Sequence, residues 1–432
     1  MTQANSSAGG AVATEVAWDE LRAIVGAEHV REAGAEDAVA GVRPRMVAEP
    51  EDETQLAAAL RWANATGLAV APRGGGSKLG WGNRPSRLDL ILSTARMDRI
   101  VEHVWSDMTV VVQAGARVAE VQQALAAHGQ HVAIDPLWPE RATIGGILST
   151  NDSGVLRLRY GALRDLIIGV TLALPDGTLA RSGGKVVKNV AGYDLPKLAT
   201  GAMGTLGVIT QAAFRLHPLL PESAARTLTF RTGSISDANR LMVELQGSAL
   251  AHTGLQARVG HETQAEVDMR FEGTPAGIEA QCATARKIAA FAAETAASTD
   301  VWQARQNLWT QAGEAALVKF SVLPTRIAGA CEAVRRATAQ AGMAWRIVTQ
   351  GTGLGWARLE SARADRLHAA LSVLRSEFEA DAGSLFVAHR PAEMAPLDAW
   401  GSPGDAYPLM LRVKQQFDPR GTLNSGRFVG GI

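Results

Sequence analysis

Four glycine-rich segments in the first half of the chain constrain its fold most strongly. They read PRGGGSKLGWG (72–82), ATIGGILSTNDSG (142–154), GGKVVKNVAGYDL (183–195) and TGAMGTLGVIT (200–210). Because glycine has no side chain, such segments either form tight turns or let main-chain N–H groups approach a ligand closely. A turn explains any one segment equally well. Four together favour a long ligand with phosphates at one end and a flat ring at the other.

Two well-known phosphate motifs are absent from these segments. None is a G-x-G-x-x-G that opens a helix after the first strand, and none is a G-x-x-x-x-G-K-[ST]. The sequence therefore argues against a Rossmann dinucleotide site and against a P-loop. The N–H groups of Gly74, Gly75, Gly76 and Ser77 still carry partial positive charges that suit a pyrophosphate. Arg73 or Lys78 would add a full charge beside them.

Composition places the chain among soluble globular proteins of two or three domains, because 47% of its 432 residues are apolar and its formal net charge is zero. No basic block favours nucleic acid as a partner. Cys282 and Cys331 lie far apart, which argues against an iron–sulfur cluster or structural zinc within this chain. We expect a cytoplasmic protein, with docking at the inner face of the cytoplasmic membrane as an alternative. Residues 1–17 lack a basic signal-peptide region and are expected to form a disordered tail.

Periodicity divides the rest of the chain in two. From about residue 42 to 220, helices and strands alternate and the glycine-rich segments lie at their junctions. Pro218 and Pro221 mark a boundary. Beyond it a β-α-β-β-α rhythm occurs twice, which predicts two ferredoxin-like units side by side in one antiparallel sheet. The expected helices of this part span Ile235–Leu245, Gly277–Ala297, Arg326–Ala341 and Ala362–Ala380.

The motifs in combination resemble a known flavoprotein family. The glycine-rich segments, together with RYGALRDLIIGVTLALPDG (159–177) and QQFDPRGTLNSGRF (415–428), look like the FAD-binding domain of the vanillyl-alcohol-oxidase and p-cresol-methylhydroxylase (PCMH) family. The resemblance covers about Val42 to Pro218 and Pro408 to the end. Within the family, KVVKNVAGYDLPKL (185–198) is most similar to the FAD-binding E subunits of bacterial glycolate oxidase complexes. Sister 2-hydroxyacid dehydrogenases carry a similar stretch.

This resemblance implies an α+β fold and a cofactor site. Residues 18–220 would form a two-part PCMH-type FAD-binding domain, residues 221–390 a ferredoxin-like antiparallel-sheet cap, and residues 391–432 a segment that returns to the first domain. The residues implied to wrap the pyrophosphate of FAD are Arg73, Gly74, Gly75, Gly76 and Ser77. Those implied along the diphosphate and the flavin are Thr143, Gly145, Gly146, Ser149, Asn151, Gly154, Tyr160, Gly161, Gly204, Gly207, Val208 and Ile209. Asn424 would bring the C-terminus back onto this domain.

Some features depart from the family pattern. Certain members carry a histidine in the first loop that bonds to the flavin. Here that stretch is glycine followed by Ser77, so we expect non-covalent FAD. Sister dehydrogenases bind a metal through cap histidines and a glutamate, whereas this chain has no histidine between Thr349 and Glu360, and we expect no metal. His389 is expected at the surface or at an interface, with a role as a base as the alternative.

The catalytic residues stay unknown at this stage, with Tyr193 and Arg390 as candidates. Tyr193 equally fits a core position, and Arg390 a structural ion pair. Lys188 and Asn189 either face the flavin or lie in a solvated turn. The cap tryptophans, expected to be core or interface anchors, are Trp302, Trp309, Trp345 and Trp356.

The resemblance implies an FAD-dependent oxidoreductase acting on the CH–OH group of 2-hydroxy acids, as a subunit of a glycolate oxidase or dehydrogenase complex. Since the chain has no cysteine set for an electron relay, its electrons must leave through another protein or to a soluble acceptor. The expected partners are a larger homologous FAD subunit and an iron–sulfur subunit, with a small 2-hydroxy acid as the substrate of the complex. The alternatives are a stand-alone FAD-dependent 2-hydroxyacid dehydrogenase built on Arg390 and Tyr193, and a scaffold subunit with structural FAD or an empty pocket.

Overall fold

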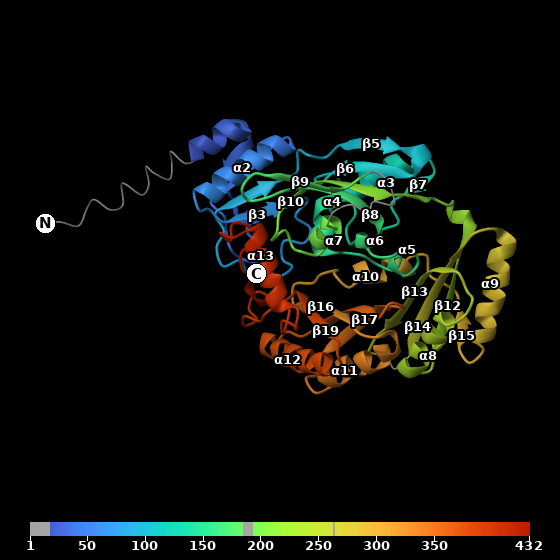
Figure 1. The fold of residues 1–432 in the computed structure, drawn as a ribbon. Helices are drawn as coiled ribbons and strands as arrows, with labels where there is room; N and C mark the ends of the chain where they lie inside the picture. Colours follow the sequence, from blue (N-terminus) through green and yellow to red (C-terminus); the bar gives the residue numbers. More distant parts are fainter. Residues whose placement is uncertain (1–17, 185–192, 262–263) are drawn as a thin grey trace.

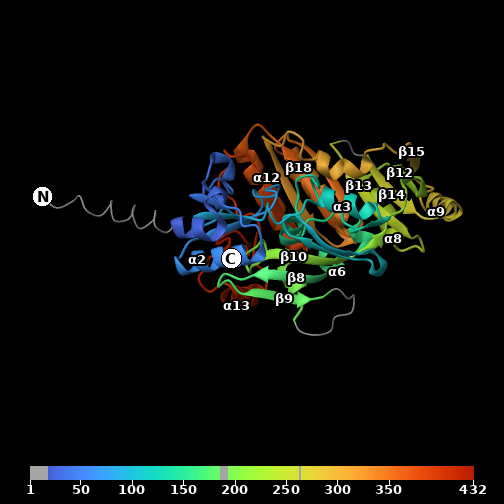
Figure 2. The same cartoon turned by 90° about the horizontal axis from the view of Figure 1, so that it is seen from above.

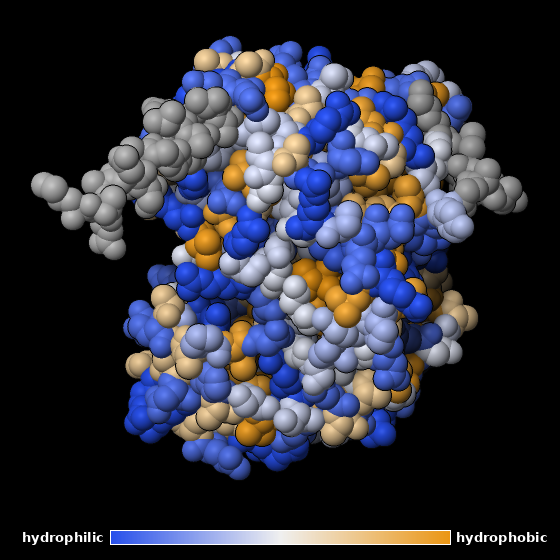
Figure 3. Space-filling model, turned by 60° about the vertical axis from the view of Figure 1, so that its left-hand side comes forward, coloured by the Kyte–Doolittle hydropathy of each residue, from blue (hydrophilic) through white to orange (hydrophobic). Residues whose placement is uncertain are grey.

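The computed structural model describes residues 18–184, 193–261 and 264–432. The proposed tail and the two candidates Lys188 and Asn189 lie outside these ranges. Figure 1 shows the N-terminal region, coloured blue to green, lying over an eight-stranded sheet coloured yellow to red. We call this sheet and its helices the cap. The space-filling view shows the two parts as lobes separated by an indentation on the face drawn (Figure 3).

The first part of the N-terminal region is a mixed four-stranded sheet. Its strands in spatial order are β1 (Val30–Glu32), β2 (Met46–Ala48), β4 (Leu90–Ser93) and β3 (Val70–Arg73), with β2, β4 and β3 parallel. Helix α2 (Glu53–Ala65) connects β2 to β3, and the Asp52 carboxylate caps it by accepting from the N–H groups of Thr54 and Gln55. Since β3 ends at Arg73, the first glycine-rich segment begins at the carboxyl end of a parallel strand, which is a common ligand position.

An antiparallel five-stranded sheet forms the second part. Its order is β5 (Ile100–Val104), β6 (Thr109–Gln113), β10 (Val208–Arg215), β8 (Ile167–Ala173) and β9 (Leu179–Gly183). The flanking elements are α3 (Val118–Ala126), β7 (Gln130–His131), α4 (Ile144–Thr150), α5 (Arg157–Tyr160), α6 (Leu163–Leu166), α7 (Leu195–Ala199) and β11 (His217–Pro218). The second glycine-rich segment is thus partly helical, because Thr143 caps α4 and Ile144, Ile147 and Leu148 bury its apolar side.

The cap is one antiparallel sheet of eight strands. Its elements in chain order are β12 (Ala225–Thr232), α8 (Ile235–Gln246), β13 (His252–Val259), β14 (Ala265–Glu272), α9 (Pro275–Ile288), β15 (Ala293–Thr295), β16 (Ala315–Ser321), α11 (Ile327–Ala339), β17 (Ala344–Gln350), β18 (Leu354–Glu360), α12 (Ala364–Ala380) and β19 (Ser384–His389). The strand order β15-β12-β14-β13-β17-β18-β16-β19 places two β-α-β-β-α-β units side by side, joined where β13 pairs with β17. The expected pair of ferredoxin-like units is confirmed.

The predicted end of one cap helix is wrong. The helix predicted over Gly277–Ala297 stops at Ile288, and β15 then pairs with β12 at the edge of the sheet. The alanine-rich sequence favours a longer helix locally. Pairing with the free edge of β12 overrides that preference, as tertiary contacts often do.

The cap helices α8, α9, α11 and α12 lie on the face of the sheet away from the N-terminal region (Figure 1). Seen from above, α9 and β15 lie at the opposite end of the molecule from α2 and α13 (Tyr407–Phe417) (Figure 2). The cap core lies between sheet and helices and includes Leu241, Leu255, Phe320 and Leu371. Among the helices in the described part of the chain, none combines the length and hydropathy needed to cross a bilayer.

The C-terminal segment returns to the N-terminal region. Val70 donates to the carbonyl of Thr422 at 2.7 Å, and Asn424 donates to the carbonyl of Val70 at 2.9 Å, so the segment lies alongside β3. The Lys414 ammonium holds it there by donating to the carbonyl of Leu423 at 3.0 Å and to the carbonyl of Thr205 at 2.8 Å. The two ends of the chain therefore build one local structure.

Candidate functional site

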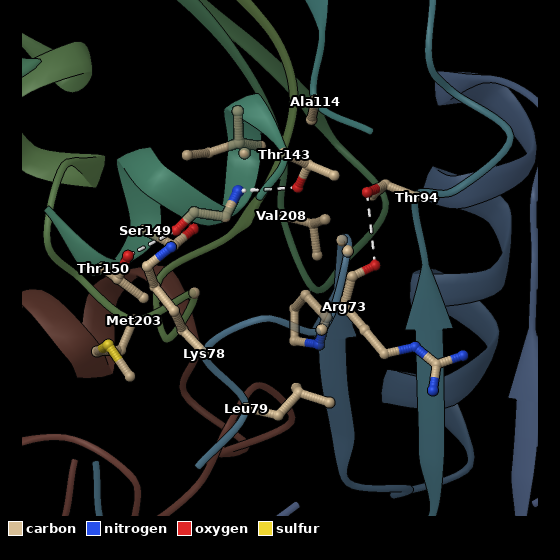
Figure 4. A pocket seen from close by; sticks show the side chains of 18 of the residues that line it. Arg73, Lys78, Leu79, Thr94, Ala114, Thr143, Ser149, Thr150, Met203 and Val208 are labelled. Atoms are coloured by element: carbon tan, nitrogen blue, oxygen red, sulfur yellow. Dashed lines mark hydrogen bonds between the residues drawn. The ribbon is translucent and has the colours of Figure 1, made fainter. Parts of the chain in front are cut away.

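A cavity opens where three segments of the N-terminal region meet the returning C-terminal segment (Figure 4). They are the loop after β3, the first turns of α4, the loop before β10 and the returning segment around Asn424. The residues of these segments that line the cavity are Pro72, Arg73, Gly74, Gly75, Gly76, Ser77, Lys78, Leu79, Thr143, Gly145, Gly146, Ser149, Thr150, Met203, Gly204, Gly207, Val208, Ile209, Asn424 and Arg427, and Thr94 and Ala114 complete the wall. Three of the glycine-rich segments thus converge on one space.

Most residues assigned to FAD from the sequence face this cavity. Asn151, Gly154, Tyr160 and Gly161 do not line it. Asn151 ends α4 in the left-handed region, with φ of 48°. Gly154 donates to Asp135 Oδ1 at 2.8 Å, and Tyr160 packs its ring against the rings of His131 and His217. These residues shape the structure behind α4, and their assignment to the cofactor remains a prediction.

The glycines are needed because two segments of main chain approach each other closely. A β-carbon at position 75 would lie 1.7 Å from the carbonyl oxygen of Arg141, and one at position 74 would lie 2.0 Å from Thr143 Oγ1. On α4, a β-carbon at Gly145 would lie 2.9 Å from the Ala114 side chain. A larger residue at position 75 must displace the opposing backbone, and one at position 74 or 145 must displace the side chain of Thr143 or Ala114. The wall of the cavity is therefore main chain at these positions.

The loop after β3 offers unused donors. No hydrogen bond joins the main-chain N–H groups of Gly74, Gly75, Gly76 or Ser77 to another described residue. The first N–H groups of α4 differ, since Gly145 donates to the carbonyl of Ala114 at 2.8 Å. Consecutive free N–H groups form a concave positive surface that suits an anionic group such as a diphosphate. The residues present thus fit the phosphates of a dinucleotide.

The charged side chains in the wall do not behave as the sequence suggested. Arg73 Nη1 lies 2.6 Å from Asp37 Oδ1, and its guanidinium extends away from the other labelled side chains in Figure 4. Hydrogen bonds from Arg31 and Arg73 hold the pKa of the Asp37 carboxyl well below its usual range. Lys78 Nζ lies 3.0 Å from Asp152 Oδ2. Both cations are therefore already paired with buried carboxylates.

Arg427 is the cation that sequence reasoning missed. It is 3% exposed, donates from Nη2 to the carbonyl of Leu79 at 2.7 Å and forms no ion pair with a described residue. Its Nε is buried without a hydrogen-bond partner. Burial lowers the pKa of Arg427 to about 10, so the side chain stays charged near neutral pH. The motif around Asn424 was the available signal, because Arg427 follows it by three residues.

Asn424 also lines the cavity and carries an unused group. Its Nδ2 donates to the carbonyl of Met203 at 2.6 Å, which ties the C-terminal segment to the loop before β10. Its Oδ1 is buried and accepts no hydrogen bond. A buried acceptor without a donor is unusual and is satisfied when a ligand supplies one.

Residues 44–183 match the family model described as an FAD binding domain. The chain contains an FAD-binding domain. Its cofactor is FAD. The cavity has free N–H groups and a buried guanidinium in its wall, and both are suited to an anionic group.

Three curated relatives match between 40% and 46% of the chain. It is 34% identical over 201 residues to a D-lactate dehydrogenase of Archaeoglobus fulgidus, covering 46% of this chain and 44% of that relative. It is 34% identical over 175 residues to glycolate oxidase subunit GlcD of Bacillus subtilis, covering 40% and 37%. It is 33% identical over 180 residues to a D-2-hydroxyglutarate dehydrogenase of Xanthomonas citri, covering 42% and 38%. Each match spans less than half of the relative.

Solved structures resemble the whole fold. A p-cresol methylhydroxylase with substrate bound aligns with a TM-score of 0.76 at 14% identity, over 96% of each chain. An alkyldihydroxyacetonephosphate synthase aligns with a TM-score of 0.70 at 16% identity, over 95% of this chain and 86% of that one. These likenesses establish the fold, and the expected PCMH-type architecture is confirmed.

Part of the seam between the FAD-binding domain and the cap is filled by what we call the aromatic cluster: Trp81, Trp138, Trp309, Trp356, Phe386, Trp400 and Phe428. The ring centroids of Trp81 and Trp356 lie 5.5 Å apart, and those of Trp138 and Trp309 lie 4.9 Å apart. Trp356 is 1% exposed. Rings from both sides therefore pack into one continuous apolar layer.

Buried charges lie beside the aromatic cluster. Asp152 lies 3.0 Å from Lys78 Nζ, and its other oxygen lies 2.9 Å from Nη1 of Arg305, which comes from α10 (Ala304–Asn307) of the cap. Burial raises the pKa of the Asp152 carboxyl, but the charges of Lys78 and Arg305 outweigh it and keep the pKa below its ordinary value. The carboxylate thus joins a wall residue of the cavity to the cap.

The remaining sequence candidates lie away from the cavity. Tyr193 is 90% exposed, so it neither lines the cavity nor packs in the core. Arg390 donates to the carbonyl of Ala395 at 3.0 Å. The His389 Nε2 lies 3.0 Å from the carbonyl oxygen of Ala312, and its ring lies near Trp309. Within the described ranges, no group of three His, Cys, Asp or Glu side chains is placed to hold a metal ion.

Proposed function

We propose that this chain is the non-covalent FAD-binding subunit of an assembly that oxidises glycolate or a related small 2-hydroxy acid. Its partners would be a larger homologous FAD subunit and an iron–sulfur subunit, and its role would be electron transfer. The observation that carries the proposal is the convergence of three glycine-rich segments and Arg427 on one cavity of an FAD-binding domain. The glycolate oxidase subunit among its relatives supports the choice of assembly.

Residues of the cavity have separate tasks in this proposal. The N–H groups from Gly74 to Ser77 bind the diphosphate of FAD, and the Arg427 guanidinium balances its charge. Asn424 Oδ1 accepts from a cofactor N–H or hydroxyl group. Bound FAD supplies a two-electron redox centre. No histidine, cysteine or tyrosine of the described residues lines the cavity, and these are the side chains that commonly bond to flavins covalently.

The seam supports the choice of a subunit over a stand-alone dehydrogenase. Next to Met203, which lines the FAD cavity, the rings of Trp81, Trp309 and Trp356 fill the seam between the FAD-binding domain and the cap. Oxidation of a hydroxy acid requires polar groups that hold its carboxylate and remove the hydroxyl proton. The aromatic cluster supplies neither. We therefore assign substrate oxidation to the partner subunit.

Anaerobic mixing with glycolate tests this division of labour. We expect the flavin of the isolated chain to stay oxidised in glycolate and D-lactate, and to become reduced when the chain is co-purified with its two partners. Bleaching of the isolated chain at a turnover rate would instead support the stand-alone enzyme. Flavin that stays oxidised in an active complex would support a scaffold with structural FAD.

A further inference from the structure

A second cavity of about 440 Å³ lies between the FAD-binding domain and the cap. One side is α3 and the loop over residues 134–140, and the other side is η5 (Val301–Gln303), α10, the middle of β13 and the end of β17. It shares no lining residue with the FAD cavity. Small-molecule sites typically occupy about 300–1,000 Å³ and often lie at domain interfaces, so this cavity has the size and position of a ligand site.

Its lining combines apolar walls with amide groups. The apolar wall residues include Ile134, Pro136, Leu137, Trp302 and Val348. The amides come from Gln122, Gln256, Gln303, Gln306 and Gln350. Such a lining is suited to a molecule with both carbon surface and hydrogen-bonding groups.

Gln350 lines the cavity and carries an unused buried group. It is 4% exposed, and its Oε1 is buried without a hydrogen-bond partner. Two other lining amides are already engaged: Gln122 exchanges two hydrogen bonds with the main chain of Val132, and Gln256 Nε2 donates to Asp268 and to the carbonyl of Val301. A buried acceptor without a donor costs stability, so the Gln350 oxygen is set to accept from a ligand.

Charged groups around the cavity do not suit an anion. Arg305 lines it, but its guanidinium already donates hydrogen bonds to Asp152 and to the carbonyl oxygens of Ser153 and Asp135. Asp135 lines it too, and burial raises the pKa of its carboxyl. Glu140 stands exposed at the rim. A carboxylate would enter here without a free cation among the described residues, which makes its desolvation costly.

We propose that this cavity binds a small uncharged molecule that donates hydrogen bonds, of the polyol or carboxamide class. The donor group pairs with Gln350 Oε1, and the carbon skeleton packs against Trp302 and Val348. Because both the FAD-binding domain and the cap line the cavity, binding stabilises their contact by mass action. The site is separate from the cofactor and from any 2-hydroxy acid handled by the assembly.

Lactamide and lactate test the ligand class, since they share a skeleton and differ in charge. Ligand-observed NMR titrations with the FAD-loaded chain are expected to show saturable lactamide binding, with lactate weaker by about tenfold or more. Lactate binding as tightly as lactamide overturns the proposal, and so does the lack of saturable lactamide binding. The flavin absorbance of the same samples reports cofactor occupancy separately.

Two variants locate the binding. Gln350→Leu removes the acceptor, and Ala119→Leu fills the cavity from α3 without removing a hydrogen-bonding side chain. Each is expected to weaken lactamide binding by about tenfold or more. Gln340→Leu, at an exposed glutamine after α11, is the matched control and should bind as the wild type does. Wild-type affinity in Ala119→Leu overturns the proposal even where Gln350→Leu folds poorly.

Discussion

Arg305 of the cap and Asp152 of the FAD-binding domain form an ion pair of 2.9 Å across the seam, with side chains 10% and 1% exposed. Arg305 also donates to the carbonyl oxygens of Ser153 and Asp135, at 2.9 and 2.5 Å. One side chain of α10 thus satisfies three acceptors on the other side. Because Asp152 also pairs with Lys78, the cap is connected to the wall of the FAD cavity through a single carboxylate.

Removing this guanidinium should destabilise the protein. Arg305→Met is expected to lower the free energy of unfolding by about 3 kcal/mol, because it leaves buried acceptors unpaired. Urea denaturation followed by circular dichroism measures the loss. Arg335→Met removes an exposed pair with Glu332 and should cost less than about 1 kcal/mol. Equal losses for the two variants would refute a special role for Arg305.

The close approach of Gly75 to the carbonyl oxygen of Arg141 predicts that a larger residue at position 75 weakens FAD binding. In Gly75→Ala the added methyl group would lie 1.7 Å from a carbonyl oxygen, so the loop must move and its N–H groups lose their arrangement. We expect FAD affinity to fall by about tenfold or more, measured by quenching of flavin fluorescence. Gly80→Ala is the control, since a β-carbon there meets nothing within 4 Å. Unchanged affinity in Gly75→Ala would show that the loop does not bind the cofactor.

Arg427 should contribute charge to cofactor binding. Arg427→Met is expected to weaken FAD by about tenfold or more, since charge-assisted hydrogen bonds are worth about 1.5–3 kcal/mol. ADP carries the diphosphate without the flavin, so a parallel loss of ADP affinity assigns the interaction to the diphosphate. Arg420→Met, at an exposed arginine of the same segment, should leave both affinities unchanged. The assignment fails if Arg427→Met binds FAD like the wild type.

Lys319 predicts a pH dependence of stability. It forms no ion pair with a described residue, and burial lowers its pKa from 10.5 to about 8. The folded state therefore loses this proton before the unfolded state does. Below pH 8 the buried charge lowers the free energy of unfolding by its full amount. This destabilisation disappears as the pH rises towards 10.5. Lys319→Met should raise the free energy of unfolding by about 2 kcal/mol near neutral pH.

Urea titrations of Lys319→Met and the wild type at several pH values measure this difference. The gain should shrink steadily above pH 8, because the wild-type lysine is then neutral when folded. A gain that is constant with pH would contradict the predicted titration and point to packing alone.

The sequence predicted the architecture well where local pattern and tertiary contact agree. The helix over Ala362–Ala380 begins two residues later, at Ala364, and keeps the expected apolar side with Leu367, Leu371 and Phe378 buried. The end of α9 was missed because β15 depends on a distant partner strand. Three of the four glycine-rich segments line the cavity, and most of the third lies outside the described residues. These segments could be recognised because glycine is evident in the sequence itself.

The partners of charged side chains were harder to predict than the course of the backbone. Arg73 was expected to face the phosphates, but Asp37, thirty-six residues earlier in the chain, holds its guanidinium. Arg427 was overlooked because nothing in its local sequence shows that it is buried without a carboxylate. Pairing of this kind depends on contacts between distant segments, and these become visible only in the folded chain.

The flavin content of the purified chain tests the central claim most directly. Purified chain reconstituted with FAD and then desalted should be yellow and hold one FAD per chain. Acid precipitation should release that flavin into the supernatant, as non-covalent binding requires. A colourless chain that takes up no FAD would contradict the account, and flavin that stays with the precipitate would contradict its non-covalent part.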